Sequence, residues 1–344
     1  MTNGSLIWSV DAADPEAKDD SEFFASPAIV SGAGGDLVLV GAGSGTMKAL
    51  KAETGEVAWS FQVGPAVKGT SGGTGKAPIT GSVVVGSKLA FVGAWDGCLY
   101  ALEPSSGKIS WKFQAMDADT GTHAQIRATP ALSKDGATVY FPAGRAMYAV
   151  DASSGKQKCA RSDCPVRLLR SLRGFAWCAR WMRQTKQVVY TSPTVAADGT
   201  IVYGGSGGGA ASALSPAGAV LWSKNLTYFA STMGASTSDG HVLLISGNTE
   251  ACRACTFLSK LSPATGEVVW SANLHEQNVQ AAAVTVDSAG TAFVPHGRGV
   301  TMVTPAGNAT ACGGGTNNSL GSVSVPAEGV LLGLNAQGEL VLAS

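Results

Sequence analysis

Two stretches of the chain repeat one pattern and decide the fold. They read Gly45-Thr-Met-Lys-Ala-Leu-Lys-Ala-Glu-Thr-Gly-Glu-Val-Ala-Trp59 and Gly97-Cys-Leu-Tyr-Ala-Leu-Glu-Pro-Ser-Ser-Gly-Lys-Ile-Ser-Trp111. Both place a glycine, an Ala-Leu pair, a Thr-Gly or Ser-Gly step and a tryptophan at the same spacing. A third copy spans residues 141–156, and weaker copies end at Trp222 and Trp270. The pattern indicates a chain built from internal repeats.

The spacing of the tryptophans gives the length of the repeat. Successive tryptophans lie 51 residues apart from 8 to 59, 52 from 59 to 111 and 48 from 222 to 270. The interval from Trp111 to Trp222 has room for two copies. We expect the first of these two copies to lack its tryptophan.

Each copy is predicted to contain four short strands. A Ser-Pro, Thr-Pro or Ala-Pro step opens it, at Ser26-Pro27, Ala77-Pro78, Thr129-Pro130 and Ser192-Pro193. β-Branched runs then alternate with glycine turns, which is typical of an antiparallel meander. One such sheet cannot bury both of its faces. Sheets packed radially around an axis solve this problem, so the predicted fold is an all-β propeller.

The two ends of the chain complete each other in this pattern. The last copy, residues 330–343, stops without a tryptophan strand, whereas the chain begins with Gly4-Ser-Leu-Ile-Trp8. We expect the N-terminal strand to close the last blade, which removes the exposed sheet edges of an open array. Six complete copies and this composite predict a seven-bladed β-propeller. Eight blades are the alternative, if residues 157–190 hold a degenerate copy.

Residues 1–344 are predicted to form a single propeller domain with an irregular basic insertion at 157–190. The insertion gathers Arg161, Arg167, Arg170, Arg173, Arg180, Arg183 and Lys186. The apolar spacing of Leu168, Leu172 and Phe175 suits a short amphipathic helix. Such a helix would dock a partner or an anionic surface. A disordered loop or a gene-model artefact is the alternative interpretation.

The composition excludes several classes of protein. Lys plus Arg and Asp plus Glu both number 24, so the net charge is zero and a nucleic-acid binder with a strongly basic surface is not expected. A hydrophobic content of 45% argues against disorder. No apolar run reaches the roughly 18 residues that span a bilayer, and no signal peptide is visible. We expect a cytoplasmic protein, or an extracytoplasmic one if the sequence is a cropped domain.

The cysteines and histidines form no recognisable chemical set. Seven cysteines are odd in number and sparse, so a disulfide scaffold is not expected. Cys252 and Cys255 make a CxxC pair, but no second pair or His pair lies at zinc spacing. We interpret this pair as ordinary loop thiols or a local disulfide, with half a zinc site and a redox pair as the alternatives. No metal site is predicted.

The repeat motif resembles that of the PQQ-repeat family, the β-propellers similar to quinoprotein alcohol dehydrogenases. The motif is Gly-x-(Leu/Met)-(Tyr/Lys)-Ala-(Leu/Val)-x-x-x-(Thr/Ser)-Gly-(Glu/Lys)-x-x-Trp, and it is recognisable in five copies. The resemblance implies that the tryptophans lie between blades and pack over the backbone of the next blade. These residues are Trp8, Trp59, Trp111, Trp222 and Trp270.

The same resemblance implies several functions. The family includes quinone-dependent dehydrogenases, non-enzymatic scaffolds such as the outer-membrane assembly lipoprotein, and propellers appended to acyl-adenylating enzymes. The alcohol dehydrogenase type uses a vicinal cysteine pair beside pyrroloquinoline quinone (PQQ), and this chain has no adjacent cysteines. We therefore hypothesise a non-catalytic, cofactor-free propeller that binds protein or small-molecule partners. The alternatives are a dehydrogenase of alcohols or sugars that uses PQQ with calcium, and the propeller module of a larger acyl-adenylating enzyme.

Residues just before each innermost strand are expected to ring the mouth of the central channel. This rule places Phe24, Lys76, Arg127 and Tyr190 around one opening, with His123 and Gln125 in the loop before Arg127. We predict that Lys76, His123, Arg127 and Tyr190 bind a ligand. A cationic and aromatic ring suits an anionic ligand, including a carboxylated quinone. The alternative is that these side chains only solvate the channel mouth.

Overall fold

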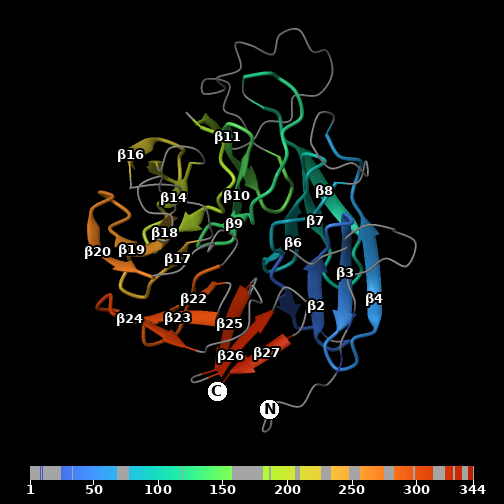
Figure 1. Ribbon diagram of the computed structural model, residues 1–344. Helices are drawn as coiled ribbons and strands as arrows, with labels where there is room; N and C mark the ends of the chain where they lie inside the picture. The colour runs from blue at the N-terminus through green and yellow to red at the C-terminus, as the bar shows by residue number, and fades with distance from the viewer. Residues whose placement is uncertain are drawn as a thin grey trace.

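The strands of the protein form a series of antiparallel sheets in chain order. The computed structural model describes residues 8, 10, 25–32, 34–67, 77–117, 119–156, 181–185, 187–205, 210–225, 234–247, 256–274, 283–296, 299–312, 322–327, 330–334 and 340–343. Within these ranges six sheets have four strands and one has three. Figure 1 shows the sheets following one another around a central axis. Neighbouring sheets touch through their first strands, which are therefore innermost.

The strands of the first three sheets are β1 (Ala28–Val30), β2 (Leu37–Gly41), β3 (Thr46–Lys51), β4 (Val57–Gln62); β5 (Val84–Val85), β6 (Ala90–Gly93), β7 (Cys98–Leu102), β8 (Ile109–Gln114); β9 (Ala131–Leu132), β10 (Thr138–Ala143), β11 (Ala146–Asp151), β12 (Trp181–Gln184). The fourth and fifth sheets contain β13 (Thr194–Val195), β14 (Ile201–Gly204), β15 (Ala210–Leu214), β16 (Val220–Asn225); β17 (Ala235–Ser236), β18 (Val242–Gly247), β19 (Thr256–Leu261), β20 (Val268–Asn273). The sixth and seventh contain β21 (Thr285–Val286), β22 (Ala292–His296), β23 (Gly299–Val303), β24 (Ala309–Cys312); β25 (Ser322–Ala327), β26 (Val330–Leu334), β27 (Leu340–Ala343).

This architecture confirms the predicted all-β propeller of four-stranded meanders. The predicted seven blades, with eight as the alternative, stay a prediction, because residues 1–7 and 157–180 lie outside the described ranges. The predicted closure of the last blade by the N-terminal strand falls on the same undescribed start of the chain. No described helix is long and apolar enough to cross a membrane.

One inter-sheet contact recurs throughout the described propeller: an indole ring packs over a turn glycine of the next sheet. The Trp59 ring covers Gly107, which has a φ of 70°, and a Cβ atom added to Gly107 would lie 2.5 Å from the ring. The Trp59 Nε1–H donates a hydrogen bond to the carbonyl of Pro104, at 2.9 Å. Glycine is required here both for its positive φ and for the close approach of the indole. The same ring-on-glycine contact joins Trp8 to Gly55, Trp111 to Gly155, Trp181 to Gly218, Trp222 to Gly266 and Trp270 to Gly307.

Trp181 corrects one prediction and one boundary. The copy between Trp111 and Trp222 does not lack its tryptophan, because Trp181 donates its Nε1–H to Pro216 at 2.8 Å and covers Gly218. Trp181 opens β12, the outer strand of the third sheet. Residues 181–184 therefore belong to a sheet and not to the predicted irregular insertion at 157–190. The predicted amphipathic helix at 168–175 lies outside the described residues.

A β-bulge precedes the tryptophan in four outer strands. In the first sheet Ala49 pairs with Trp59 but Leu50 pairs with Val57, so Ala58 is the extra residue. The second, fourth and fifth sheets show the same register shift next to Trp111, Trp222 and Trp270. A bulge bends and twists the strand locally. In each of these strands the bulge therefore turns the indole ring toward the next sheet.

A second repeated contact links the innermost strands through hydroxyl groups. The Ser26 N–H donates to Ser82 Oγ at 2.9 Å, the Ser82 N–H to Thr129 Oγ1 at 2.7 Å, and the Thr129 N–H to Ser192 Oγ at 2.9 Å. The predicted opening step Ala77-Pro78 is therefore wrong. The second copy opens at Ser82-Val83, just before β5, because the shared feature of the step is the hydroxyl group and not the proline.

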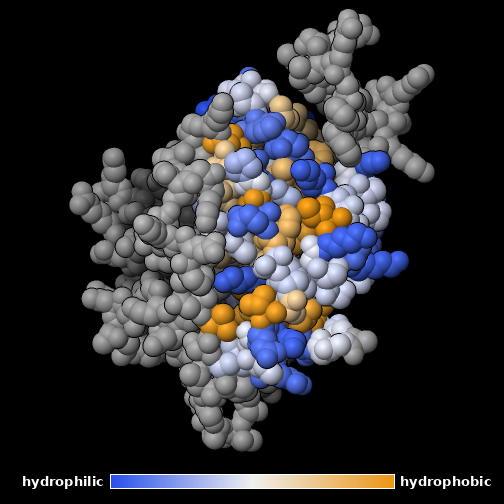
Figure 2. Space-filling model, turned by 90° about the vertical axis from the view of Figure 1, so that its right-hand side faces the viewer, coloured by the Kyte–Doolittle hydropathy of each residue, from blue (hydrophilic) through white to orange (hydrophobic). Residues whose placement is uncertain are grey.

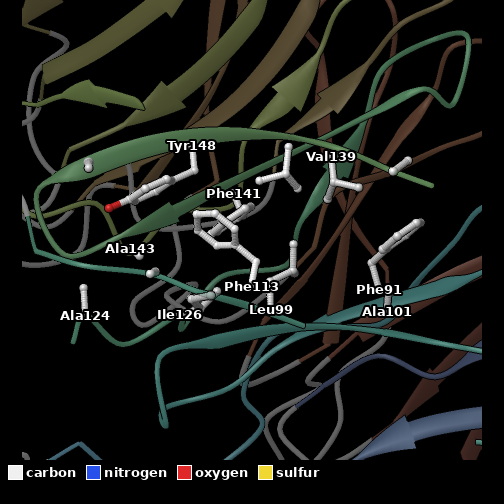
Figure 3. Packing of buried hydrophobic residues seen from close by; sticks show 14 residues of the cluster. Phe91, Leu99, Ala101, Phe113, Ala124, Ile126, Val139, Phe141, Ala143 and Tyr148 are labelled. Carbon is white, nitrogen blue, oxygen red and sulfur yellow. The ribbon is translucent and has the colours of Figure 1, made fainter. Parts of the chain in front are cut away.

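The core lies between the sheets. Between the second and third sheets, Phe113 meets Phe141 edge to face at 5.8 Å between ring centroids, and Phe141 stacks on Tyr148 at 5.3 Å (Figure 3). Phe91, Leu99 and these rings belong to one buried cluster. Burying each large apolar side chain stabilises the fold by about 1.5–3 kcal/mol. This layer holds the second and third sheets together beneath the candidate site.

The fifth sheet contains one buried charge. Lys260 faces Trp270 at the register where Ala49, Ala101 and Ala213 face their own tryptophans. The buried Lys260 Nζ lies 2.6 Å from Asp239, and His241 Nδ1 lies 3.2 Å from the same carboxylate. The hydrogen bond from Lys260, helped by one from the Thr237 hydroxyl, holds the pKa of Asp239 well below its usual range. A paired carboxylate thus makes the buried ammonium group tolerable.

The glycine requirement can be tested with Gly107→Ala. The added methyl group meets Trp59, so we expect a loss of about 2–4 kcal/mol in the free energy of unfolding, measured by urea denaturation. Gly136→Ala is the matched control, because Gly136 has a similar φ of 68° but nothing within 4 Å of an added Cβ. This control should lose only about 1–2 kcal/mol. Equal losses in the two variants would show that the indole contact does not impose the requirement.

The hydroxyl link can be tested at Thr129. Thr129→Val removes the acceptor of the buried Ser82 N–H, and an unsatisfied buried donor costs about 1–3 kcal/mol. Thr129→Ser retains the hydroxyl group and should lie within about 1 kcal/mol of the wild type. Thermal and urea unfolding measure both differences. A valine variant as stable as the serine variant contradicts a role for this hydrogen bond.

The buried ion pair predicts a dependence of stability on pH. Because the pKa of Asp239 is lowered in the folded state, its contribution is fully present above the ordinary carboxyl range and is lost progressively as the pH falls below that range toward the lowered pKa. Asp239→Asn should therefore be less stable than the wild type at pH 7, by about 1 kcal/mol, since solvent screens this half-exposed carboxylate. The difference should shrink toward pH 3 in urea titrations. A difference that is constant over this range would rule out the ion pair as its source.

Candidate functional site

The candidate site is built on the connection between the second and third sheets. After β8 the chain folds back on itself over residues 115–124, where Met116 and His123 form an isolated β-bridge. The Tyr148 hydroxyl on β11 donates a hydrogen bond to the Met116 carbonyl. Burial raises the pKa of Tyr148 to about 12, so the hydroxyl remains a donor at neutral pH. The core of Figure 3 thus anchors the loop that carries the polar side chains.

Asp117 closes the tip of this loop. Its Oδ1 accepts hydrogen bonds from the backbone N–H of Asp119 at 3.0 Å, from that of Thr120 at 3.0 Å and from the Thr120 hydroxyl at 3.1 Å. Burial opposes ionisation of Asp117, but these hydrogen bonds outweigh it and lower the pKa of the carboxyl group. Asp117 is therefore an anion that organises the loop.

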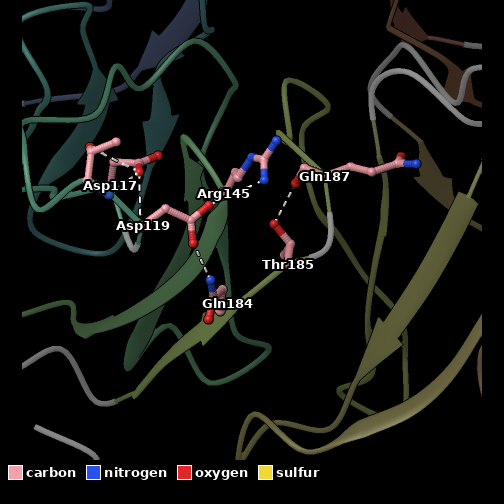
Figure 4. Close-up of polar contacts among 7 residues, drawn as sticks. Asp117, Asp119, Arg145, Gln184, Thr185 and Gln187 are labelled. Atoms are coloured by element: carbon pink, nitrogen blue, oxygen red, sulfur yellow. Dashed lines mark hydrogen bonds and ion pairs between the residues drawn. The ribbon is translucent and has the colours of Figure 1, made fainter. Parts of the chain in front are cut away.

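Asp119 joins the loop to the third sheet (Figure 4). Its Oδ2 lies 3.3 Å from Nη1 of Arg145, which sits in the turn between β10 and β11. Gln184, at the end of β12, donates its Nε2–H to the same carboxylate. Next along the chain, the Thr185 hydroxyl donates to the Gln187 carbonyl at 2.6 Å. Three separate segments are thereby held in one polar network.

A second cluster lies beside the network, around the guanidinium of Arg127. The guanidinium is sandwiched between two aromatic rings, with its Cζ 4.0 Å from the centroid of Trp95 and 4.6 Å from that of Tyr190. Its Nε–H donates to Gln125 Oε1 at 2.8 Å. Each cation–π contact contributes about 0.5–2 kcal/mol. The Thr80 hydroxyl donates to the Arg127 carbonyl and accepts from Trp95 Nε1, both at 2.9 Å, which completes the cluster.

The two clusters border one open cavity of about 470 Å³. Its lining includes Asp119, Thr122, His123, Gln125, Arg145 and Tyr190. A smaller hollow of about 300 Å³, lined by Asp119, Arg145, Gln184 and Thr185, adjoins it. The main cavity has the volume of a small-molecule site.

The structure brings together three of the four predicted ligand-binding residues. His123 and Tyr190 line the cavity, while Arg127 lies behind Tyr190 and holds it. Lys76 and Phe24 lie outside the described residues. Counting back two residues from the hydroxyl of each opening step gives Thr80, Arg127 and Tyr190, so Thr80, and not Lys76, occupies the equivalent position of the second copy.

Sequence reasoning missed Trp95, Asp119 and Arg145. Trp95 and Arg145 lie in the second turns of neighbouring copies, between β6 and β7 and between β10 and β11. An alignment of those two turns would have shown that Trp95 and Arg145 lie at the same end of adjacent sheets. Asp96, beside Trp95, supports its turn by accepting the Cys98 N–H at 2.9 Å, and it also accepts the Tyr100 hydroxyl and the Gly64 N–H.

The described part of the cavity lining offers little free positive charge to a carboxylated quinone. It contains two carboxylates and one guanidinium, and Asp119 already pairs with that guanidinium. Three hydrogen-bond donors occupy Asp117 Oδ1, which leaves it poorly suited to a calcium ion. Among the residues that the structure describes, no group of three His, Cys, Asp or Glu side chains could hold a metal ion. Cys98 is a buried free thiol, and burial raises its pKa to about 11.

Comparisons with known proteins agree with the fold. Over 93% of this chain and 84% of the other, the protein resembles the crystal structure of BamB from Moraxella catarrhalis, with a TM-score of 0.61 and 15% identity. A streptogramin B lyase structure matches 96% of this chain and 95% of the other, with a TM-score of 0.63 and 12% identity. A search of curated proteins found no match. A PQQ-repeat family model, described as outer membrane protein assembly factor BamB, matches residues 1–163 and 71–255. These matches span residues 1–255 of 344, and the chain therefore belongs to the BamB-like family of PQQ-repeat propellers.

Proposed function

We propose that this protein is a non-catalytic propeller that acts as a scaffold for protein partners. The observation that carries the proposal is that the described tryptophans and the carboxylates of the candidate site are engaged in structural contacts. The tryptophan–glycine contact recurs at six junctions, and the carboxylates of the candidate site are bound to backbone N–H groups or to Arg145. The family model is described as an outer membrane protein assembly factor. A protein-binding role fits both observations.

The outer strands offer surfaces for such partners. In β4, β8, β16 and β20 the residues at the start of the strand are apolar and between 38% and 55% exposed: Val57, Ile109, Val220, Leu221, Val268 and Val269. Each of these strands is the end strand of its described sheet. Figure 2 shows apolar residues on one side of the molecule as separate spots among hydrophilic ones. An apolar strand at the end of its described sheet favours binding of an extended segment of another protein.

The proposal is tested with the tagged full-length chain. A protein that co-purifies from the source cells is identified, produced separately and titrated against the wild type by calorimetry. Combined Val57→Ser, Ile109→Ser, Val220→Ser and Val268→Ser substitutions should weaken binding at least tenfold, about 1.4 kcal/mol. The control, Lys51→Ser with Glu56→Ser, removes an exposed ion pair and should leave the affinity within about twofold.

A second arm tests the enzymatic alternative. The protein is titrated with PQQ and calcium and assayed for dye reduction with alcohols and aldose sugars. We expect neither tight binding nor turnover. Turnover that depends on PQQ would overturn the non-catalytic function, whatever the result of the partner titration.

A further inference from the structure

We propose that the cavity between the second and third sheets binds a neutral saccharide. The cavity is separate from the apolar outer strands, so this site is independent of the protein-scaffold function. Its lining alternates side chains that donate and accept hydrogen bonds, among them Asp119, Thr122, His123 and Arg145. Asp119 and Arg145 pair with each other at 3.3 Å, and the guanidinium N–H groups and carboxylate lone pairs outside that contact are the donors and acceptors for sugar hydroxyl groups. At about 470 Å³ the cavity has room for a small saccharide.

Tyr190 supplies the apolar surface that a sugar ring needs. The side chain lines the cavity and is 46% exposed, although the Arg127 guanidinium covers one face of its ring. The uncovered part of the ring is therefore the surface open to a ligand. An aromatic ring flanked by hydrogen-bonding groups binds both the C–H face and the hydroxyl groups of a pyranose.

The site is fixed before a ligand arrives. Arg127 is a positioning residue. Its guanidinium lies between the rings of Trp95 and Tyr190, and its Nε–H donates to the Gln125 amide oxygen. Asp117 fixes the loop that carries Asp119, through hydrogen bonds to three donors. Preorganisation of this kind lowers the entropic cost of binding.

The charges select a neutral ligand. Among the described residues of the lining, Asp117 and Asp119 contribute two negative charges and Arg145 contributes one positive charge. The lining therefore disfavours phosphorylated or carboxylated ligands. Tyr190 is the one aromatic side chain among the described residues of this lining, so they would not enclose a planar base between two rings. A sugar ring needs only a single aromatic face.

The test uses saturation-transfer NMR and calorimetry with the full-length chain. The probes are glucose, N-acetylglucosamine, maltose and cellobiose, with glucuronic acid, glucose 6-phosphate and adenosine as charged and planar comparisons. We expect at least one neutral saccharide to bind at least tenfold more tightly than each comparison compound.

The variants separate the roles of the residues. Tyr190→Ala should weaken binding at least tenfold, whereas Tyr190→Phe keeps the aromatic face and should remain within about threefold. Arg127→Leu should weaken binding even though Arg127 does not line the cavity, and circular dichroism and the unfolding midpoint establish that each variant is folded. Met182→Ala, at an exposed residue of β12 outside the cavity lining, is the matched control and should bind like the wild type.

Three results would overturn the proposal. The first is the absence of binding by any neutral saccharide at tens of millimolar, roughly the weakest affinity that still reflects a site. The second is unchanged binding in a folded Tyr190→Ala variant. The third is tighter binding of adenosine or of an anionic sugar, which would assign the cavity to another class of ligand.

Discussion

The packing of one indole ring on one glycine of the next sheet is the contact on which this propeller depends. A four-stranded sheet leaves two apolar faces exposed, and it must cover both of them with its neighbours. The tryptophan at the outer rim and the hydroxyl link at the inner rim fix the spacing of adjacent sheets at two different radii. Aromatic layers such as that around Phe141 fill the space between these radii. Each sheet is thus specified mainly by its two neighbours, as in other repeat proteins.

The candidate site is a consequence of this arrangement. Connections between sheets and turns between the second and third strands lie at one end of adjacent sheets, so side chains distant in the sequence meet there. Asp119 comes from a connection, Arg145 from a turn and Gln184 from the end of an outer strand. Two contacts hold the connection in place: the Tyr148 hydroxyl donates to the Met116 carbonyl from the core, and Asp117 accepts the N–H groups at the tip.

The strands that follow the repeat were predictable from the sequence, whereas residues outside the repeat pattern were missed. The period of the tryptophans located the strands, since a tryptophan over a glycine leaves a recognisable pair of residues. Trp181 was not recognised as the tryptophan of the third copy because residues 156–180 separate it from the glycine turn at Gly155, whereas the tryptophan lies four positions after its glycine in the first two copies. Proline was mistaken for the marker of the inner strand at Ala77-Pro78, whereas the hydrogen bond requires only a hydroxyl group, as at Ser82. Arg127 and Tyr190 lie against each other, since they precede the equivalent inner strands of successive sheets. Asp119 and Arg145 could not be paired from the sequence, since nothing local relates a connection to a turn of the following sheet.

Both repeated contacts run in one direction along the chain. The indole N–H of each earlier copy donates to a carbonyl of the following copy, and the inner-strand N–H groups of residues 26, 82 and 129 donate to hydroxyl groups that come later. A sheet leaving the ribosome therefore meets its protein acceptors only after the next stretch of polypeptide has followed, and water binds its donors until then. Synthesis from the N-terminus would make these contacts available one sheet at a time, in chain order.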